Sequence, residues 1–174
     1  GFTSGSTGDP KGVVHTSNTL CIEHLVWVRA FELGANDVLF IPSTVGHQLG
    51  WTAMRATMMI GATVVFPERW EPKSAVATME RERVTFTFTT PAFVYDVLGL
   101  PDTGAKSLPS LKTWVQAGQV VTRTLREESI AKLPHVRFAH LFGMTEMGCV
   151  IMTDVGTPPE KALATGRPQP SVEI

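Results

Sequence analysis

The chain has 174 residues, which is long enough for one domain with a sizeable core, and it combines 43% hydrophobic residues with a formal net charge of −1 at pH 7. This balance is typical of a soluble globular protein and lacks the surplus basic charge of nucleic-acid binding, so we expect small-molecule partners. Cys21 and Cys149 show no metal-ligand spacing, and we expect reduced thiols in a cytoplasmic protein. The most apolar region, 54–66, is interrupted by Arg55, Gly61 and threonines, so we expect no membrane span.

The chain opens with a polar, glycine-rich segment over residues 1–15. Its hydroxyl, glycine and lysine members that we expect to bind phosphate are Thr3, Ser4, Gly5, Ser6, Thr7, Gly8 and Lys11. Glycines let backbone N–H groups turn toward one concavity, hydroxyls add donors and the lysine adds a point charge, so the segment predicts a polyphosphate-binding loop. The Walker A pattern places its lysine between a glycine and Ser or Thr, whereas Lys11 lies between Pro10 and Gly12, which argues against a P-loop NTPase.

Hydrophobic periodicity predicts alternating helices and strands in the rest of the chain. Thr16 and Ser17 are good N-cap candidates for the first helix, Gly34 ends it, and Thr122 caps the last helix. Short runs rich in β-branched and aromatic residues predict strands between the helices. The expected helices cover 16–33, 50–59, 72–83, 90–98 and 122–133, and the expected strands cover 38–42, 61–66, 85–88, 111–116, 136–142 and 150–152.

This alternation predicts an α/β fold, with a mostly parallel sheet covered by helices on both faces. Ligands in such folds bind beyond the carboxyl ends of the strands. Four segments lie at those ends, namely 43–50, 89–93, 117–121 and 143–149. We therefore expect the ligand site to form from these segments.

The segment TSGSTGDPKG, residues 3–12, resembles the phosphate loop of the adenylate-forming superfamily, which includes acyl-CoA synthetases, adenylation domains of peptide synthetases and luciferases. Residues 141–146, LFGMTE, resemble the Tyr-Gly-x-Thr-Glu motif, with Phe142 in place of the tyrosine. Residues 116–121, QAGQVV, stand where the family has a Gly-Gly-Ala segment, with Ala117 in place of the first glycine and Gln119 in place of the alanine. Residues 45–50, VGHQLG, resemble the loop that lines the pocket for the carboxylate substrate.

The resemblance implies a role for individual residues of these motifs. It implies that the phosphate loop, including Lys11, binds the β- and γ-phosphates of ATP, that Thr145 binds the α-phosphate, and that Glu146 ligates Mg²⁺. Lys11, Thr145 and Glu146 are thus the implied catalytic residues. The residues implied to face adenine are Gly118, Gln119, Val120 and Phe142, and those implied to line the acyl pocket are His47, Trp51, Ala117 and Gly143.

The resemblance covers essentially the whole chain and implies that 1–174 is a single α/β piece of a larger N-terminal AMP-binding domain. Within it, 1–15 is the phosphate loop, 16–153 a βα-repeat subdomain and 154–174 the start of the next β-subdomain. The ribose-binding aspartate and the C-terminal domain with its adenylation lysine are expected beyond Ile174. We therefore expect the isolated 174 residues to be inactive, and the loop from Thr3 to Lys11 not to form a competent phosphate site in them.

The activity implied is that of an acid–CoA ligase, which uses ATP, Mg²⁺ and CoA to convert a carboxylic acid first to an acyl-adenylate and then to a thioester. An apolar acid of moderate size is favoured over an amino acid, because the expected loops contain no acidic residue to meet an ammonium group. Two alternatives remain, a carrier-protein-loading adenylation domain and a non-catalytic nucleotide-binding module. His47 as a purely structural loop residue, and 116–121 as an ordinary strand-to-helix connection, also remain open.

Overall fold

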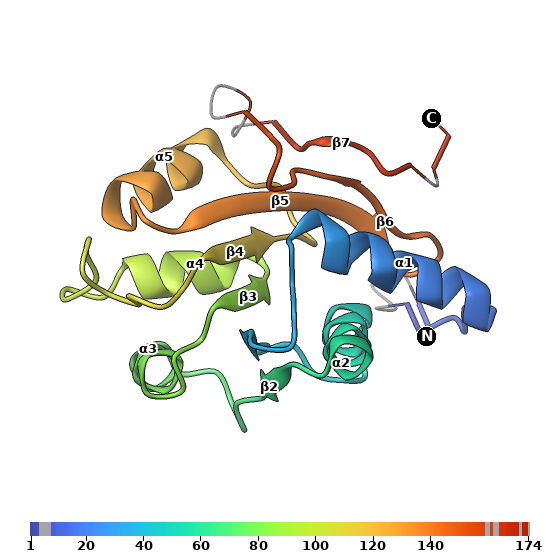
Figure 1. The fold of residues 1–174 in the computed structure, drawn as a ribbon, viewed down its shortest axis with the longest axis horizontal. Helices are drawn as coiled ribbons and strands as arrows, with labels where there is room; N and C mark the ends of the chain where they lie inside the picture. Colours follow the sequence, from blue (N-terminus) through green and yellow to red (C-terminus); the bar gives the residue numbers. More distant parts are fainter. Residues whose placement is uncertain (4–7, 159–160, 162–163, 171, 174) are drawn as a thin grey trace.

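A computed structural model describes residues 1–3, 8–158, 161, 164–170 and 172–173. Within these residues one seven-stranded sheet has the order β2-β1-β3-β4-β5-β6-β7 (Figure 1). The strands are β1 (Val38–Phe40), β2 (Thr63–Val65), β3 (Phe86–Thr89), β4 (Thr113–Gln116), β5 (Arg137–Met144), β6 (Gly148–Met152) and β7 (Arg167–Pro168). The helices are α1 (Ser17–Ala30), α2 (Gln48–Ile60), α3 (Pro72–Arg81), α4 (Pro91–Leu98) and α5 (Arg123–Lys132).

The five strands β2, β1, β3, β4 and β5 are parallel, which confirms the predicted mostly parallel sheet. β6 and β7 extend it in the antiparallel sense. The physical reason is the connection: residues 145–147 form a tight turn between β5 and β6, and a parallel return would need a crossover of a dozen or more residues. The two-residue strand β7 was not predicted.

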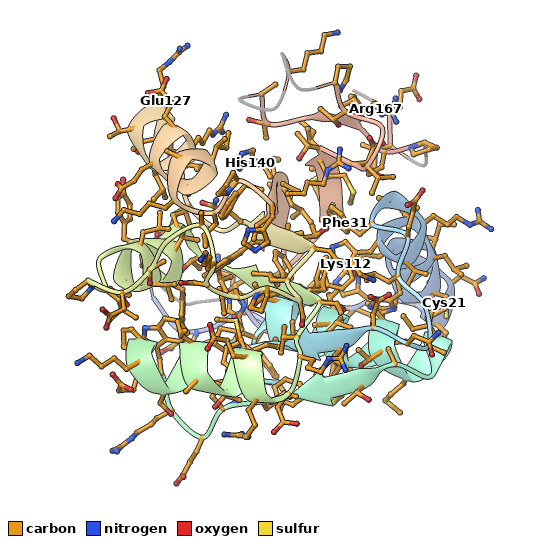
Figure 2. All side chains as sticks on the ribbon, turned by 60° about the vertical axis from the view of Figure 1, so that its left-hand side comes forward. Cys21, Phe31, Lys112, Glu127, His140 and Arg167 are labelled. Atoms are coloured by element: carbon orange, nitrogen blue, oxygen red, sulfur yellow. The ribbon has the colours of Figure 1, made fainter. Side chains whose placement is uncertain are left out.

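Two apolar cores lie on opposite faces of the sheet. Successive strand residues point to opposite faces, so Leu39 and Val115 join one core while their neighbours Phe40 and Trp114 join the other. The first core is covered by α1 and α2, and the second by α3, α4 and α5 (Figure 1). Figure 2 shows Phe31, which follows α1, turned toward the sheet.

The helix starts follow local capping signals. Thr16 forms a capping box with Thr19, and the Thr122 hydroxyl accepts from the Leu125 N–H, as expected for the two predicted caps. α2 begins at Gln48, two residues before its expected start, because the His47 side chain acts as the cap. α1 ends at Ala30 and not near 33.

The two ends of the N-terminal segment pair with each other. Phe2 and Gly12 form an antiparallel bridge, and the N–H of Thr3 donates to the carbonyl oxygen of Lys11 at 3.0 Å. The predicted phosphate-binding residues Ser4, Gly5, Ser6 and Thr7 lie outside the described residues. Across the part of the chain that is described, no helix has the length and apolar character needed to cross a membrane.

Candidate functional site

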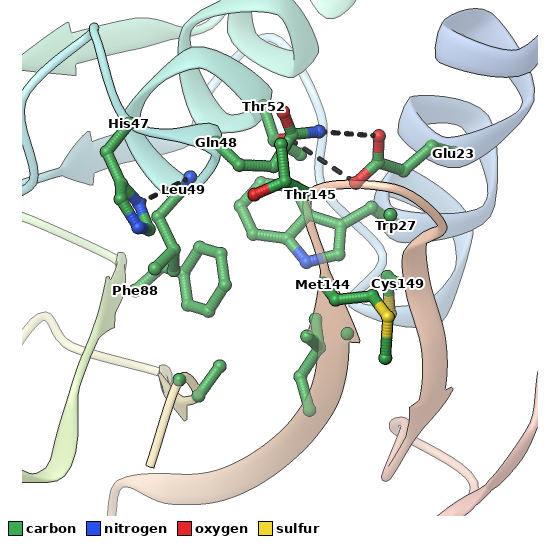
Figure 3. Close-up of a pocket in the computed structure, with 15 residues that line it drawn as sticks. Glu23, Trp27, His47, Gln48, Leu49, Thr52, Phe88, Met144, Thr145 and Cys149 are labelled. Atoms are coloured by element: carbon green, nitrogen blue, oxygen red, sulfur yellow. Dashed lines mark hydrogen bonds between the residues drawn. The ribbon is translucent and has the colours of Figure 1, made fainter. Parts of the chain in front are cut away.

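A cavity of about 150 Å³ lies at the carboxyl edge of the parallel strands (Figure 3). Three of the four edge segments expected from the sequence contribute to it: 43–50 through His47, 117–121 through Ala117 and Gly118, and 143–149 through its hairpin residues. Its lining residues include Glu23, Trp27, His47, Gln48, Leu49, Thr52, Phe88, Ala117, Gly118, Leu141, Gly143, Met144, Thr145, Gly148 and Cys149. We call this the apolar pocket, because most of its exposed lining is carbon.

His47 stands at the edge of the apolar pocket and also caps α2. Its Nδ1 accepts a hydrogen bond of 3.2 Å from the N–H of Leu49. In the neutral ring, an accepting Nδ1 places the proton on Nε2, so Nε2 is the donor of this imidazole. His47 therefore has a structural role as the cap of α2, which the sequence left open, and it also lines the apolar pocket.

A second pocket, of about 360 Å³, adjoins the first. We call it the flat pocket, after the flat adenine ring that its residues are implied to face, and it is lined by Gln116, Gly118, Gln119, Val120, Val121, Arg126, His140, Leu141, Phe142, Gly143 and Thr165. Gly118 has φ +80°, a left-handed conformation that favours glycine, and it lines both pockets together with Leu141 and Gly143. Each of the four residues implied to face adenine lines the flat pocket: Gly118, Gln119, Val120 and Phe142. Ala117, which the resemblance assigns to the acyl pocket, lines the apolar pocket.

The hairpin between β5 and β6 carries the predicted Thr145 and Glu146. Gly143 allows the two strands to come close, since a Cβ there would lie 2.3 Å from the carbonyl oxygen of Gly148. The turn is tied to the N-terminal segment by His15, whose Nε2 lies 2.7 Å from the carbonyl oxygen of Thr145. Thr145 therefore lines the apolar pocket, whereas Glu146 is exposed at the turn.

Two predicted residues lie elsewhere. Trp51 does not line the apolar pocket; it borders a neighbouring hollow with Gly1, His15 and Arg55, and the guanidinium of Arg55 lies 5.5 Å from its ring centre. Lys11 is exposed on the N-terminal segment, and its N–H donates to the Thr3 hydroxyl at 3.0 Å.

Glu23 is a pocket residue that sequence reasoning missed. It belongs to α1, and its carboxylate accepts from Gln48 Nε2 at 3.3 Å and from the Thr52 hydroxyl at 3.4 Å (Figure 3). It also accepts from the backbone N–H of Cys149. Burial raises the pKa of Glu23 above its ordinary value of 4.5. The three hydrogen-bond donors and the nearby His15 lower this pKa, but their effect is smaller than that of burial. The sequence around Glu23 did not indicate a site residue, because only the packing of α1 against the rest of the domain turns this side chain toward the pocket.

Gln116 is a second residue that was not predicted. It ends β4, is fully buried and borders the flat pocket. Neither its amide oxygen nor its amide nitrogen hydrogen-bonds with the described residues. A buried amide without a partner is costly, so this side chain is suited to a ligand that offers both a donor and an acceptor.

A magnesium ion could be held at the hairpin turn only with help from a ligand. No cluster of three or more His, Cys, Asp or Glu side chains with metal-site geometry occurs among the described residues. Mg²⁺ is commonly bound by one or two carboxylates together with substrate phosphates and waters, not by an all-protein cage. The exposed carboxylate of Glu146, which makes no hydrogen bond or ion pair with the described residues, fits that mode.

Fold and site together define the class: a largely parallel α/β domain with two adjoining ligand pockets at the carboxyl edge of its strands. The family model described as AMP-binding enzyme matches residues 1–174, and the chain belongs to this family. The superfamily recognised from the sequence motifs is thereby confirmed.

Similar proteins include several named ligases. The chain is 26% identical to the medium-chain fatty-acid–CoA ligase of Escherichia coli over 99% of the chain and 31% of that protein. It is 33% identical to the fatty acid–[acyl-carrier-protein] ligase ScoC of Streptomyces coeruleorubidus over 98% of the chain and 34% of that protein. The chain thus spans about a third of the length of these curated relatives.

Among solved structures, the fold is similar to that of the O-succinylbenzoate coenzyme A synthetase of Bacillus subtilis, in complex with ATP and a magnesium ion. The TM-score is 0.85 at 23% identity, and the match covers 99% of this chain and 35% of that one. At this identity the likeness concerns the fold, and it confirms the predicted α/β architecture.

Proposed function

We propose that the protein carrying this chain activates a carboxylic acid with ATP and transfers the acyl group to CoA. The observation that carries the proposal is the shared wall of the two pockets. Gly118, Leu141 and Gly143 line both, and Thr145 lies beside them. An acid in the apolar pocket and a nucleotide in the flat pocket would meet at this wall, where bond formation requires them to be in contact.

In the first step a carboxylate oxygen attacks the α-phosphate of ATP, and pyrophosphate leaves. The Thr145 hydroxyl would donate to the α-phosphate, and the carbonyl contact with His15 would keep its turn in place. His47 Nε2–H is a donor that could orient the acid at the pocket edge. Mg²⁺, held by Glu146 and the phosphates, would supply neutralisation of phosphate charge.

In the second step the CoA thiol attacks the acyl carbon and AMP leaves. Gly118 and Gly143 would leave room for this attack, because neither residue has a side chain that could block the wall between the pockets. Lys11 and the phosphate loop are proposed to hold the β- and γ-phosphates. For residues 1–174 alone we propose no turnover, because the ribose aspartate and the adenylation lysine are expected outside them.

The test is acid-dependent exchange of pyrophosphate into ATP by the full-length protein, followed by AMP release with and without CoA. Exchange that needs an acid, and thioester formation that needs CoA, would support the proposal. The Thr145→Ala variant is expected to lose exchange by about 10²-fold. Absence of exchange with every acid tested would contradict the proposed activation.

A second function is favoured by one similarity. The relative with 33% identity is named as a ligase that loads an acyl-carrier protein. The acceptor would then be a carrier-bound thiol, with the same adenylation step. Offering CoA and a phosphopantetheinylated carrier protein in parallel, after adenylation has been measured, separates the two.

A further inference from the structure

The carboxylate of Glu23 forms part of the wall of an otherwise largely apolar pocket. In Figure 3 it lies on the side opposite His47, with the indole of Trp27 between them. Trp27 is fully buried, and the side chains of Leu49, Phe88, Ala117 and Leu141 contribute further apolar surface. An ionised group in such surroundings is unfavourable unless polar partners compensate it.

The partners of Glu23 compensate it in part. An ionised carboxylate offers about four acceptor positions. Three donors are present, from Gln48, Thr52 and the Cys149 backbone, and the two side-chain bonds are long, at 3.3 and 3.4 Å. No lysine, arginine or histidine of the described residues forms a salt bridge with it. The pocket therefore presents an acceptor with unused capacity and uncompensated negative charge.

The neighbouring groups do not supply the missing donor. Two chargeable side chains lie near Glu23. His15 directs Nε2 to the carbonyl oxygen of Thr145, and the Cys149 thiol stays uncharged because burial and, to a smaller extent, Glu23 raise its pKa. Gly148 leaves space for the carboxylate, since a Cβ at this position would lie 2.8 Å from the carboxyl carbon of Glu23. Glu23 is thus held close to the hairpin with its remaining acceptor capacity available to the cavity.

When a carboxylic acid binds in the apolar pocket, the negative charge of Glu23 influences which acid is accepted. Two carboxylates in one poorly hydrated cavity repel each other, and the repulsion is relieved when the ligand brings a donor to the protein carboxylate. The cavity of about 150 Å³ has the scale of a site that accepts one six-membered ring. A ring-sized acid with a polar donor on its body matches both features.

We propose that Glu23 makes the apolar pocket selective for a carboxylic acid whose ring-sized apolar body carries a hydroxyl or protonated amino group, which donates to the Glu23 carboxylate. This inference rests on the proposed function, because it takes the apolar pocket as the acid site. It also revises the expectation of an apolar acid. That expectation was based on the lack of acidic residues in the loops, whereas Glu23 lies on α1. An acid without the donor leaves Glu23 facing hydrocarbon, and loss of one charge-assisted hydrogen bond weakens binding by about 10- to 100-fold.

The test measures binding apart from turnover. The probes are 3- and 4-hydroxybenzoate and 4-(aminomethyl)benzoate, each compared with its methyl or ethyl analogue of similar shape, and the Kd is measured by calorimetry on the full-length protein. At least one donor acid is expected to bind 10-fold or more tightly than its analogue. Glu23→Gln should reduce this ratio to about 3-fold or less, and Glu23→Leu should favour the apolar analogue. Glu68→Gln, the same charge change at an exposed loop position, should leave the ratio unchanged.

Each result decides the inference. It is overturned if the apolar analogues bind as tightly as the donor acids, if no probe binds, or if Glu23→Gln keeps the full ratio. Because glutamine preserves the shape of the side chain, this variant remains informative even if Glu23→Leu does not fold. Donor-selective binding that depends on Glu23, without acid-dependent pyrophosphate exchange, would support the inference and contradict the proposed function. Acid-dependent exchange that does not change in the Glu23 variants would support the proposed function and contradict the inference.

Discussion

Replacement of Gly143 by alanine is expected to disturb the site without touching any charged group. The new Cβ would lie 2.3 Å from the carbonyl oxygen of Gly148, 3.0 Å from its carbonyl carbon and 3.1 Å from the Cα of Cys149. These are backbone atoms of β6, so no side-chain rotation relieves the contact. Restoring an ordinary carbon–oxygen contact of about 3.3 Å requires the β5–β6 hairpin to open by about 1 Å.

The size of the effect follows from that displacement. Overpacking of this kind costs about 1 to 3 kcal/mol in the free energy of unfolding. For a domain of this length it corresponds to a Tm lower by about 2 to 12 °C. Thr145 and Glu146 lie on the same hairpin, and a displacement of about 1 Å in a positioned group can cost about 10²-fold in rate. Thermal unfolding and acid-dependent pyrophosphate exchange measure the two effects.

The matched control is Gly104→Ala, in the connection between α4 and β4. A Cβ there has no atom within 4 Å, and the backbone is not left-handed, so stability should stay within about 0.5 kcal/mol. If Gly143→Ala shows the same Tm as this control and keeps its exchange rate within about 2-fold, the close strand approach does not position the turn.

Three further predictions concern single side chains. Glu146→Gln should lower the rate of Mg²⁺-dependent exchange by about 10²-fold or more and leave the Tm unchanged. The control Glu127→Gln, at an exposed position of α5 (Figure 2), should change neither the exchange rate nor the Tm. Equal losses of exchange in the two variants would contradict the metal role of Glu146. Trp27→Ala should lower the free energy of unfolding by about 3 to 5 kcal/mol in chemical denaturation, because the indole is fully buried; a loss below about 1 kcal/mol would refute its place in the core. Burial, with a smaller effect of Arg55, lowers the pKa of His24 from 6.5 to about 4. Since the unfolded chain binds this proton near pH 6.5, stability should fall as the pH drops from 6.5 toward 4, and an NMR titration midpoint near 6.5 in the folded protein would contradict the burial.

Features with a local cause were predictable. Thr16 and Thr122 cap α1 and α5 because a side-chain hydroxyl bonds N–H groups three residues away, which needs no tertiary contact. α1, in contrast, ends at Ala30 although Gly34 marked a later end; Glu32 has φ +53°, so the chain turns before the glycine is reached. The end of this helix depends on how the chain enters β1.

The site was predictable where motifs follow strands. Ala117, Gly118, Gly143 and Thr145 line one cavity because carboxyl ends of parallel strands meet at one edge, a rule that sequence alternation is enough to invoke. Trp51 was predicted for the same cavity but borders the neighbouring hollow, because the rotation of α2 decides which of its faces meets the sheet. The individual roles of these residues remain predictions.

Local sequence was therefore sufficient for the alternation of elements, the mostly parallel sheet and the family, since periodicity, caps and contiguous motifs are properties of neighbouring residues. Packing decided the rest. The pairing of β7 with β6, the buried amide of Gln116, which has no hydrogen bond with the described residues, and the carboxylate of Glu23 in the apolar pocket all depend on contacts between segments distant in the chain. A helix residue has no local signal for the cavity that it faces, because that cavity exists only after α1, α2 and the β5–β6 hairpin have come together.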